Sequence, residues 1–137
     1  MIVDASIAFK WIANEADTDL ANRLLTISDV TAPTLLLVEV GNGIWKKALR
    51  EEIDGAVSFS DEIRSLSRIV TIIEEVEYIP RALELARELN HAIYDCVYLA
   101  MAEAHDEVVV TADAKFIAKL ASTQYARLVV SLHEAAA

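Results

Sequence analysis

The sequence predicts a three-layer α/β/α fold, in which helices cover both faces of a parallel β-sheet. Short all-apolar runs alternate with helix-length segments, which is typical of strands that are buried on both faces and joined by crossover helices. No linker rich in proline, glycine or serine and no internal repeat divides the chain. A length of 137 residues is enough for one core of this kind. We therefore expect a single domain over residues 1–137.

The individual elements follow from apolar periodicity and from β-branched runs. Strands are expected at residues 1–3, 30–32, 69–73, 108–111 and 128–131. Helices are expected at residues 6–13, 18–26, 34–50, 56–68, 80–89, 93–105 and 114–120. Pro33 and Pro80 suit helix starts, where the N–H that proline lacks would have no partner in the helix. Gly41 and Gly43 should each weaken their helix by about 1 kcal/mol relative to alanine.

Composition and charge exclude several functions. The formal net charge of −10 has the wrong sign for coating nucleic acid, so a nucleic-acid substrate would need a local basic rim or metal ions. Cys96 is the only cysteine, and no signal peptide or apolar stretch of roughly 20 residues is evident, so we expect a cytoplasmic protein without a membrane role. Phosphate-binding glycine loops, zinc-ligand spacing and a nucleophile elbow are missing as well. The histidines are expected on the surface or in packing; they are His91, His105 and His133.

Four carboxylates stand where surface acids are not expected. Asp4 directly follows the first apolar run and Asp113 follows a later one, so both would lie at the carboxyl ends of strands. In open parallel sheets the ligand crevice lies beyond those ends, where the strand order reverses. Glu39 interrupts an apolar stretch that predicts a buried helix, and Asp95 is surrounded by apolar residues without another charge.

Such acids need compensation, because an isolated buried charge is very costly. No lysine or arginine near Asp95 in the sequence offers it a local partner. Converging carboxylates are hard oxygen ligands, so Mg²⁺ or Mn²⁺ would neutralise them and would activate water for phosphodiester cleavage. The alternative for Asp4, Asp95 and Asp113 is an ordinary role at a helix start, as a cap or in the first turn.

Four segments carry a more specific pattern. They are, in order, Met1-Ile2-Val3-Asp4-Ala5-Ser6, Glu39 with Asn42 three residues later, Tyr94-Asp95-Cys96-Val97-Tyr98-Leu99-Ala100, and Val110-Thr111-Ala112-Asp113-Ala114-Lys115-Phe116. Together they resemble PIN-domain ribonucleases, especially the VapC-type toxins of type II toxin–antitoxin pairs, over essentially the whole chain. The resemblance implies a five-stranded parallel sheet, an acidic pocket holding Mg²⁺ or Mn²⁺, hydrolysis of single-stranded RNA, a homodimer, and inhibition by a cognate VapB-like antitoxin.

The resemblance also implies roles for individual residues. The acidic quartet of the family corresponds to Asp4, Glu39, Asp95 and Asp113, and its accessory polar positions correspond to Ser6, Asn42 and Thr111. Basic residues near these positions would contact RNA phosphates or else lie on a solvated helix face; they are Lys10, Lys46, Lys47, Arg50 and Lys115.

Two questions stay open at this point. Large apolar side chains are expected in the core, with a groove for an antitoxin helix as the alternative; they are Phe9, Trp11, Ile12 and Trp45. The function could also be that of a catalytically silent PIN-type interaction module, or of a metal-dependent DNA nuclease or phosphatase using the same pocket. Mn²⁺-dependent cleavage of RNA would exclude the silent module, and a comparison of RNA, DNA and a small phosphoester would separate the other two.

Overall fold

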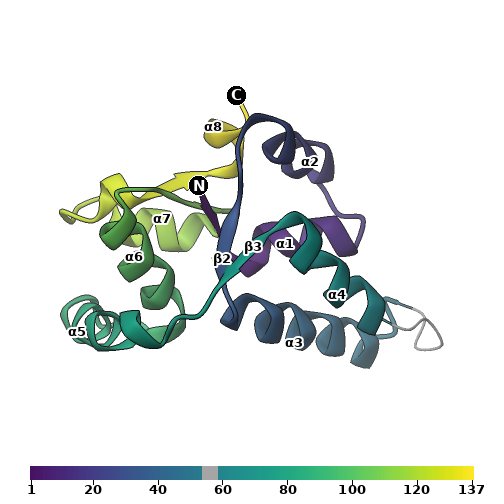
Figure 1. The fold of residues 1–137 in the computed structure, drawn as a ribbon, viewed down its shortest axis with the longest axis horizontal. Coiled ribbons are helices and arrows are strands. Elements are labelled where there is room, and N and C mark those ends of the chain that lie inside the picture. The colour runs from purple at the N-terminus through teal and green to yellow at the C-terminus, as the bar shows by residue number, and fades with distance from the viewer. Residues whose placement is uncertain (54–58) are drawn as a thin grey trace.

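The computed structural model describes residues 1–53 and 59–137, and Figure 1 shows their arrangement. Five strands form one parallel sheet in the order β3-β2-β1-β4-β5, as predicted. The strands are β1 (Ile2–Val3), β2 (Thr31–Pro33), β3 (Thr71–Ile73), β4 (Val109–Thr111) and β5 (Val129–Ser131). Because successive strands are added on both sides of β1, the strand order reverses between β1 and β4.

Helices follow the strands and cover the sheet on both faces, which confirms the three-layer α/β/α prediction. The α-helices are α1 (Ala5–Ile12), α2 (Thr18–Ile27), α3 (Leu35–Leu49), α4 (Ser60–Ile69), α5 (Ile79–Leu89), α6 (Ile93–His105), α7 (Ala114–Leu120) and α8 (Leu132–Ala135). Two 3₁₀ helices are η1 (Val76–Tyr78) and η2 (Ala126–Leu128). In Figure 1, α5 and α6 lie on one side of β2 and β3, and α3 and α4 lie on the other. No helix of the described residues is long and apolar enough to cross a membrane.

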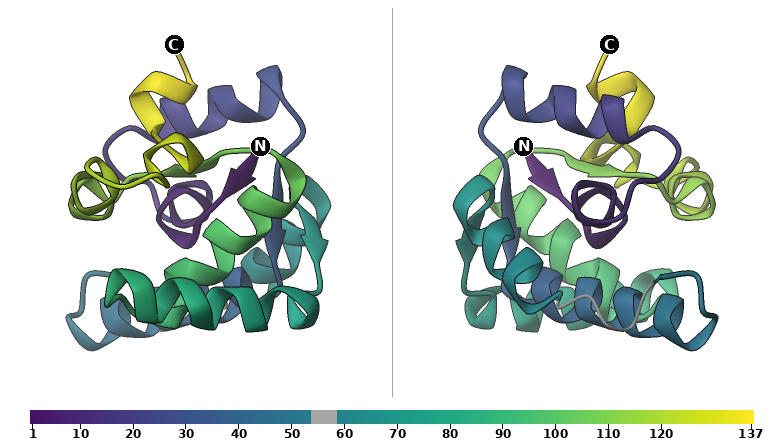
Figure 2. Two further views of the ribbon diagram at one scale, coloured as in Figure 1. Left: turned by 90° about the vertical axis from the view of Figure 1, so that its left-hand side faces the viewer. Right: turned by 90° about the vertical axis from the view of Figure 1, so that its right-hand side faces the viewer.

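The predicted elements agree with the structure except near a few boundaries. Ile69 ends α4, so the third strand begins at Thr71 rather than at residue 69. The predicted helix over 56–68 begins at Ser60 in the described part of the chain, and its residues 56–58 lie outside the described residues. The short α8 was not predicted, although Ser131 and Glu134 form a capping box at its start. Figure 2 shows α8 beside α2.

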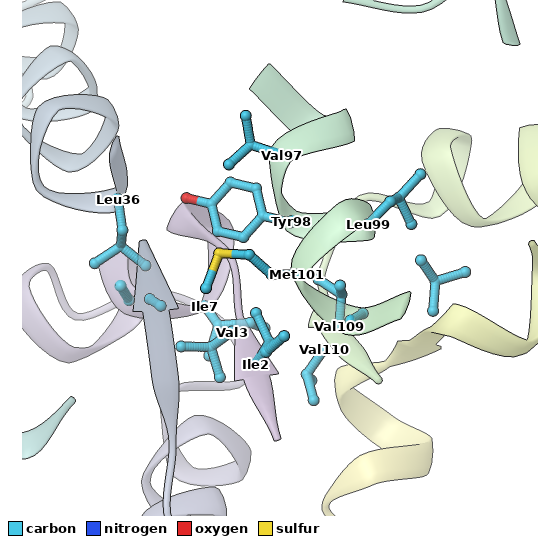
Figure 3. Close-up of a cluster of buried hydrophobic side chains, with 14 of the residues drawn as sticks. Ile2, Val3, Ile7, Leu36, Val97, Tyr98, Leu99, Met101, Val109 and Val110 are labelled. Carbon is cyan, nitrogen blue, oxygen red and sulfur yellow. The ribbon is translucent and has the colours of Figure 1, made fainter. Parts of the chain in front are cut away.

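The core lies between the sheet and its helices, and α6 contributes much of it. Residues 96–102 of α6 are buried throughout, including the free thiol of Cys96. Figure 3 shows the ring of Tyr98 among Leu36, Val97 and Met101. Because the middle of α6 is apolar, this helix packs against α5, β2 and β4. This packing fixes the position of the first turn of α6, which carries Asp95.

The prediction that α3 is a buried helix was wrong for one of its faces. Val38, Trp45 and Leu49 are 71%, 56% and 64% exposed, so Trp45 does not lie in the core. Phe9, Trp11 and Ile12 of α1 are partly buried against the core instead. Val38, Trp45 and Leu49 recur seven and four residues apart, which places them along one side of the helix.

Candidate functional site

Asp4 lies at the carboxyl end of β1, where β1 pairs with β4. Its Oδ1 accepts hydrogen bonds from the backbone N–H of Ser6 at 3.0 Å and of Ile7 at 3.4 Å, so Asp4 is the N-cap of α1. The Ser6 hydroxyl donates to the same oxygen at 2.5 Å. It also accepts from the Ala112 N–H at 2.9 Å. The accessory residue Ser6 thus ties Asp4 to the segment that follows β4.

Asp113 lies on that segment, and its carboxylate is exposed. Oδ1 accepts from the N–H groups of Lys115 and Phe116 at 3.0 and 3.1 Å, which makes Asp113 the N-cap of α7. Thr111 is fully buried, and its hydroxyl accepts from the Asp113 N–H at 3.1 Å and lies 3.4 Å from that of Ser6. Both Asp4 and Asp113 therefore have the capping role that was the structural alternative, and both stand where the strand order reverses.

Glu39 reaches the site from α3, on which it is partly buried. Its Oε1 accepts a 2.7 Å hydrogen bond from the hydroxyl of Tyr98, which lies in the core on α6. Asn42, one turn further along α3, is exposed. The contact with Tyr98 fixes Glu39 beside the first turn of α6, which carries Asp95.

Asp95 has a partner that the sequence analysis did not assign. Nε2 of His91, four residues earlier and just ahead of α6, lies 2.5 Å from Oδ2 of Asp95. His91 also packs on Phe116, in line with its predicted packing role, but that prediction did not include the contact with Asp95. The Asp95 side chain is 34% exposed rather than buried, because it stands in the first turn of α6 at the rim of the core.

Burial and mutual repulsion disfavour the charged forms of two of these acids. Burial raises the pKa of Asp4 to about 6; hydrogen bonds from Ser6 and Thr111 oppose this rise, and the charge of Asp95 adds to it. Burial also raises the pKa of Glu39, against the lowering effect of the Tyr98 hydrogen bond and with further rises from the charges of Asp95 and Asp4. Asp4, Glu39 and Asp95 thus lie close enough to repel one another.

Three of the four carboxylates are each held through a single oxygen: Oε1 of Glu39, Oδ2 of Asp95 and Oδ1 of Asp113. The second oxygen of these three makes no hydrogen bond with any described residue. Asp4 accepts from Ser6 and Ile7 through Oδ1 and also interacts with the hydroxyl of Thr111. None of the four pairs with a lysine or arginine of residues 1–53 and 59–137. As oriented here, no three acid, histidine or cysteine side chains in these ranges converge tightly enough to hold an ion. The donor chemistry nevertheless fits a hard divalent cation, since free carboxylate oxygens and uncompensated negative charge are what such an ion needs.

Two hollows border Glu39 on either side. One, of about 530 Å³, lies between α3 and α6 and is lined by Val38, Asn42, Lys46 and Tyr94, among others. The other, of about 330 Å³, lies between α1 and α3 and includes Ser6, Lys10 and Glu15.

The five candidate basic residues differ in their surroundings. Lys10 pairs with Glu15 at 3.5 Å, and Lys47 pairs with Glu15 at 3.5 Å and with Glu52 at 3.8 Å. Lys46 is exposed and lines the larger hollow. The remaining two, Arg50 at the end of α3 and Lys115 at the start of α7, are exposed. Lys46 is therefore the basic side chain best placed to meet a substrate beside Glu39.

Two contacts at the site escaped the sequence analysis. The contact of His91 with Asp95 is local, since the two residues are four apart, and could have been considered. The contact of Tyr98 with Glu39 joins two helices remote in sequence, so no local spacing reports it. The search for a partner of Asp95 considered only lysine and arginine. A histidine that donates a hydrogen bond to the carboxylate satisfies it equally well.

Known proteins resemble this chain in sequence. A model of the PIN domain matches residues 1–121. Ribonuclease VapC1 of Mycobacterium tuberculosis is 30% identical over 121 residues, which cover 85% of this chain and 88% of that protein. Ribonuclease VapC3 of Pyrobaculum aerophilum is 25% identical over 122 residues, covering 87% of this chain and 93% of that protein. This chain belongs to the PIN-domain family, and to its VapC-type branch.

Solved structures agree with this assignment at the level of the fold. The crystal structure of PAE2754 from Pyrobaculum aerophilum superposes with a TM-score of 0.74 at 21% identity, covering 98% of this chain and 90% of that one. A toxin–antitoxin complex from Klebsiella pneumoniae contains a chain with a TM-score of 0.66 at 20% identity, covering 96% of each. The predicted family and the predicted fold are both confirmed.

Proposed function

We propose that this protein is a metal-dependent endoribonuclease, the toxin of a toxin–antitoxin pair, which hydrolyses single-stranded RNA. The observation that carries the proposal is that Asp4, Glu39 and Asp95 come from three different elements and lie close enough to repel one another. Asp113 stands at the neighbouring strand end, and none of the four acids pairs with a lysine or arginine among the described residues. The names of the relatives, which are ribonucleases, support the choice of RNA as substrate.

Asp4, Asp95 and Asp113 would hold the principal Mg²⁺ or Mn²⁺ ion directly or through water, and Glu39 would position a second ion or the attacking water. A bound divalent cation supplies charge neutralisation, polarisation of the phosphate and a more acidic water. Ser6 and Thr111 hold Asp4 and the Asp113 backbone in place, while Asn42 and Lys46 face the substrate. Water attacks phosphorus in line as the bond to the 3′-oxygen breaks, which leaves a 5′-phosphate and a 3′-hydroxyl.

Matched substitutions at the two ends of α6 test this function. Asp95→Asn removes a proposed ligand, and Asp106→Asn makes the same chemical change just beyond the last residue of the helix. We expect Asp95→Asn to abolish Mn²⁺-dependent cleavage of single-stranded RNA while the protein stays folded, and Asp106→Asn to cleave like the wild type. Full activity in EDTA, or equal activity of the two variants, would refute the proposal. Single-stranded DNA and a small phosphoester at the same metal concentration test the rival activities.

A VapB-like antitoxin and a second copy of this chain are the proposed protein partners, in the cytoplasm. Val38, Trp45 and Leu49 leave an apolar strip exposed along α3. The strip lies next to the four predicted site acids, Asp4, Glu39, Asp95 and Asp113, which we call the acidic cluster. We assign this strip to the antitoxin, whose basic side chains would complement a chain of net charge −10 and would compete with the metal ion. The structural neighbour from Klebsiella pneumoniae, a toxin–antitoxin complex, supports such a partner. Light scattering of the purified chain tests the homodimer.

A further inference from the structure

A path of three side chains leads from Asp95 away from the acidic cluster to α7. Nε2 of His91 lies 2.5 Å from Oδ2 of Asp95, and Nδ1 of the same ring lies 3.0 Å from Nζ of Lys119. The ring also stacks on Phe116, with centroids 5.0 Å apart and planes 30° apart. Two residues of α7 therefore fix a histidine that contacts a proposed metal ligand on α6.

The contacts with Lys119 and Asp95 agree on which nitrogen of His91 carries the proton. A lysine ammonium has three N–H donors and no acceptor, so Nδ1 of His91 must accept from Lys119. In a neutral imidazole the single proton is then on Nε2, which faces Asp95. Nζ of Lys119 also donates to the carbonyl oxygen of Asn90 at 2.9 Å, so two acceptors define its position.

We propose that Lys119 and His91 are positioning residues for the cation at the acidic cluster. Lys119 on Nδ1 and Asp95 on Nε2 both require the Nε2–H tautomer, and Lys119 holds the ring so that His91 donates to Oδ2 of Asp95 and Oδ1 is presented to the metal ion. The inference rests on the proposed function, because it places a divalent cation at Asp95. Hydrogen bonds behind a ligating carboxylate orient it, and their loss lowers metal affinity by about 10- to 100-fold.

The tautomer is tested without metal or RNA, by nitrogen NMR of the ¹⁵N-labelled protein. In the wild type we expect His91 to show a protonated Nε2 and an unprotonated Nδ1. In Lys119→Met, Nδ1 loses its donor while Asp95 still accepts from Nε2, so we expect the Nδ1 signal to shift and the Nε2 signal to change much less. An Nδ1–H tautomer or a doubly protonated ring in the wild type would overturn the proposal.

Calorimetric titration with Mn²⁺ tests the consequence for metal binding. His91→Gln keeps an N–H near the position of Nε2 and should retain the wild-type affinity, whereas His91→Leu should lose about 10- to 100-fold. His133→Leu is the control, because it removes another His–Asp contact, 3.3 Å from Asp17. Circular dichroism establishes that each variant is folded. Equal affinity of the wild type and His91→Leu would overturn this inference alone, whereas no Mn²⁺ binding by the wild type would refute the proposed function as well.

Discussion

The hydroxyl of Tyr98 on α6 donates a 2.7 Å hydrogen bond to Oε1 of Glu39 on α3, which joins two helices that are remote in sequence. Tyr98 is only 1% exposed, so water does not replace Glu39 as its partner. Tyr98 therefore packs in the core and also holds one acid of the cluster. Removing its hydroxyl should lower the stability of the protein and change the pKa of Glu39.

Tyr98→Phe should lower the free energy of unfolding by about 1–3 kcal/mol at pH 7, because the Glu39 carboxylate loses its donor in a partly buried place. The Tyr98 hydrogen bond lowers the pKa of Glu39, so its loss raises that pKa further. The destabilisation should accordingly shrink at pH 4, where Glu39 is protonated. Urea unfolding at both pH values measures this. Tyr94→Phe, which changes an exposed tyrosine one turn earlier, is the control, and an equal loss at both pH values would contradict the prediction.

The raised pKa of Asp4 should make the stability of the protein depend on pH when no metal ion is bound. Its pKa is about 6 in the folded protein and 3.8 in the unfolded chain, so the folded state holds the proton more tightly. Stability from this residue is therefore fully present below about pH 4 and is lost as the pH rises through 6. A pKa that rises from 3.8 to about 6 corresponds to a loss of stability of at most about 3 kcal/mol. The partial exposure of Asp4 reduces this figure.

Asp4→Asn should remove that dependence, since an amide does not titrate. Urea unfolding in EDTA between pH 4 and pH 8 would give the two curves, and their difference isolates Asp4 from the other acids. If the difference between wild type and Asp4→Asn stays constant over this range, the pKa of Asp4 is not raised in the folded protein.

The two glycines of α3 should respond oppositely to alanine. A Cβ at Gly41 would meet only Cδ1 of Ile63 at 3.8 Å, so Gly41→Ala should stabilise the protein by up to about 1 kcal/mol through helix propensity. A Cβ at Gly43 would lie 3.0 and 3.2 Å from ring atoms of Phe9, and that crowding should cancel or reverse the gain. Thermal unfolding of both variants decides the matter. Stabilisation by Gly43→Ala as large as by Gly41→Ala would show that Phe9 moves aside freely.

Lys46 and Lys47 are neighbouring lysines that test whether RNA lies in the larger hollow beside Glu39, which we call the substrate groove. Lys46 lines the hollow beside Glu39, whereas Lys47 is engaged by Glu15 and Glu52. In an Asp95→Asn background, which should bind RNA without cutting it, Lys46→Gln should lower the slope of log affinity against log salt by about 0.7. Lys47→Gln should change it less. Fluorescence anisotropy with a labelled single strand measures both, and identical slopes would remove Lys46 from the groove.

The strands and most helices were predictable because their patterns are local. The position of Asp4 was also predictable, since an acid directly after a buried strand of a parallel sheet must stand at the carboxyl end of that strand. The exposure of Trp45 was not, because α3 is apolar nearly all round and its periodicity does not distinguish the covered face from the open one.

Contacts between elements lay beyond the sequence pattern. The stacking of His91 on Phe116 and the reach of Lys119 to His91 depend on how α7 packs against the start of α6. Asp113 was predicted as an acid at a strand end, with a helix cap as the alternative, and it does cap α7; its exposure was not predicted. Local sequence patterns therefore predicted where the acids lie, whereas most of their contacts depend on how the elements pack.

The pairing of β1 with β4 also determines when the acidic cluster can form during synthesis of the chain. Asp4 is synthesised more than a hundred residues before its neighbours across that pairing, Thr111 and Asp113. A nascent chain that ends before β4 has neither the buried hydroxyl nor the fourth carboxylate. The four acids therefore cannot be brought together until β4 and the start of α7 have been synthesised.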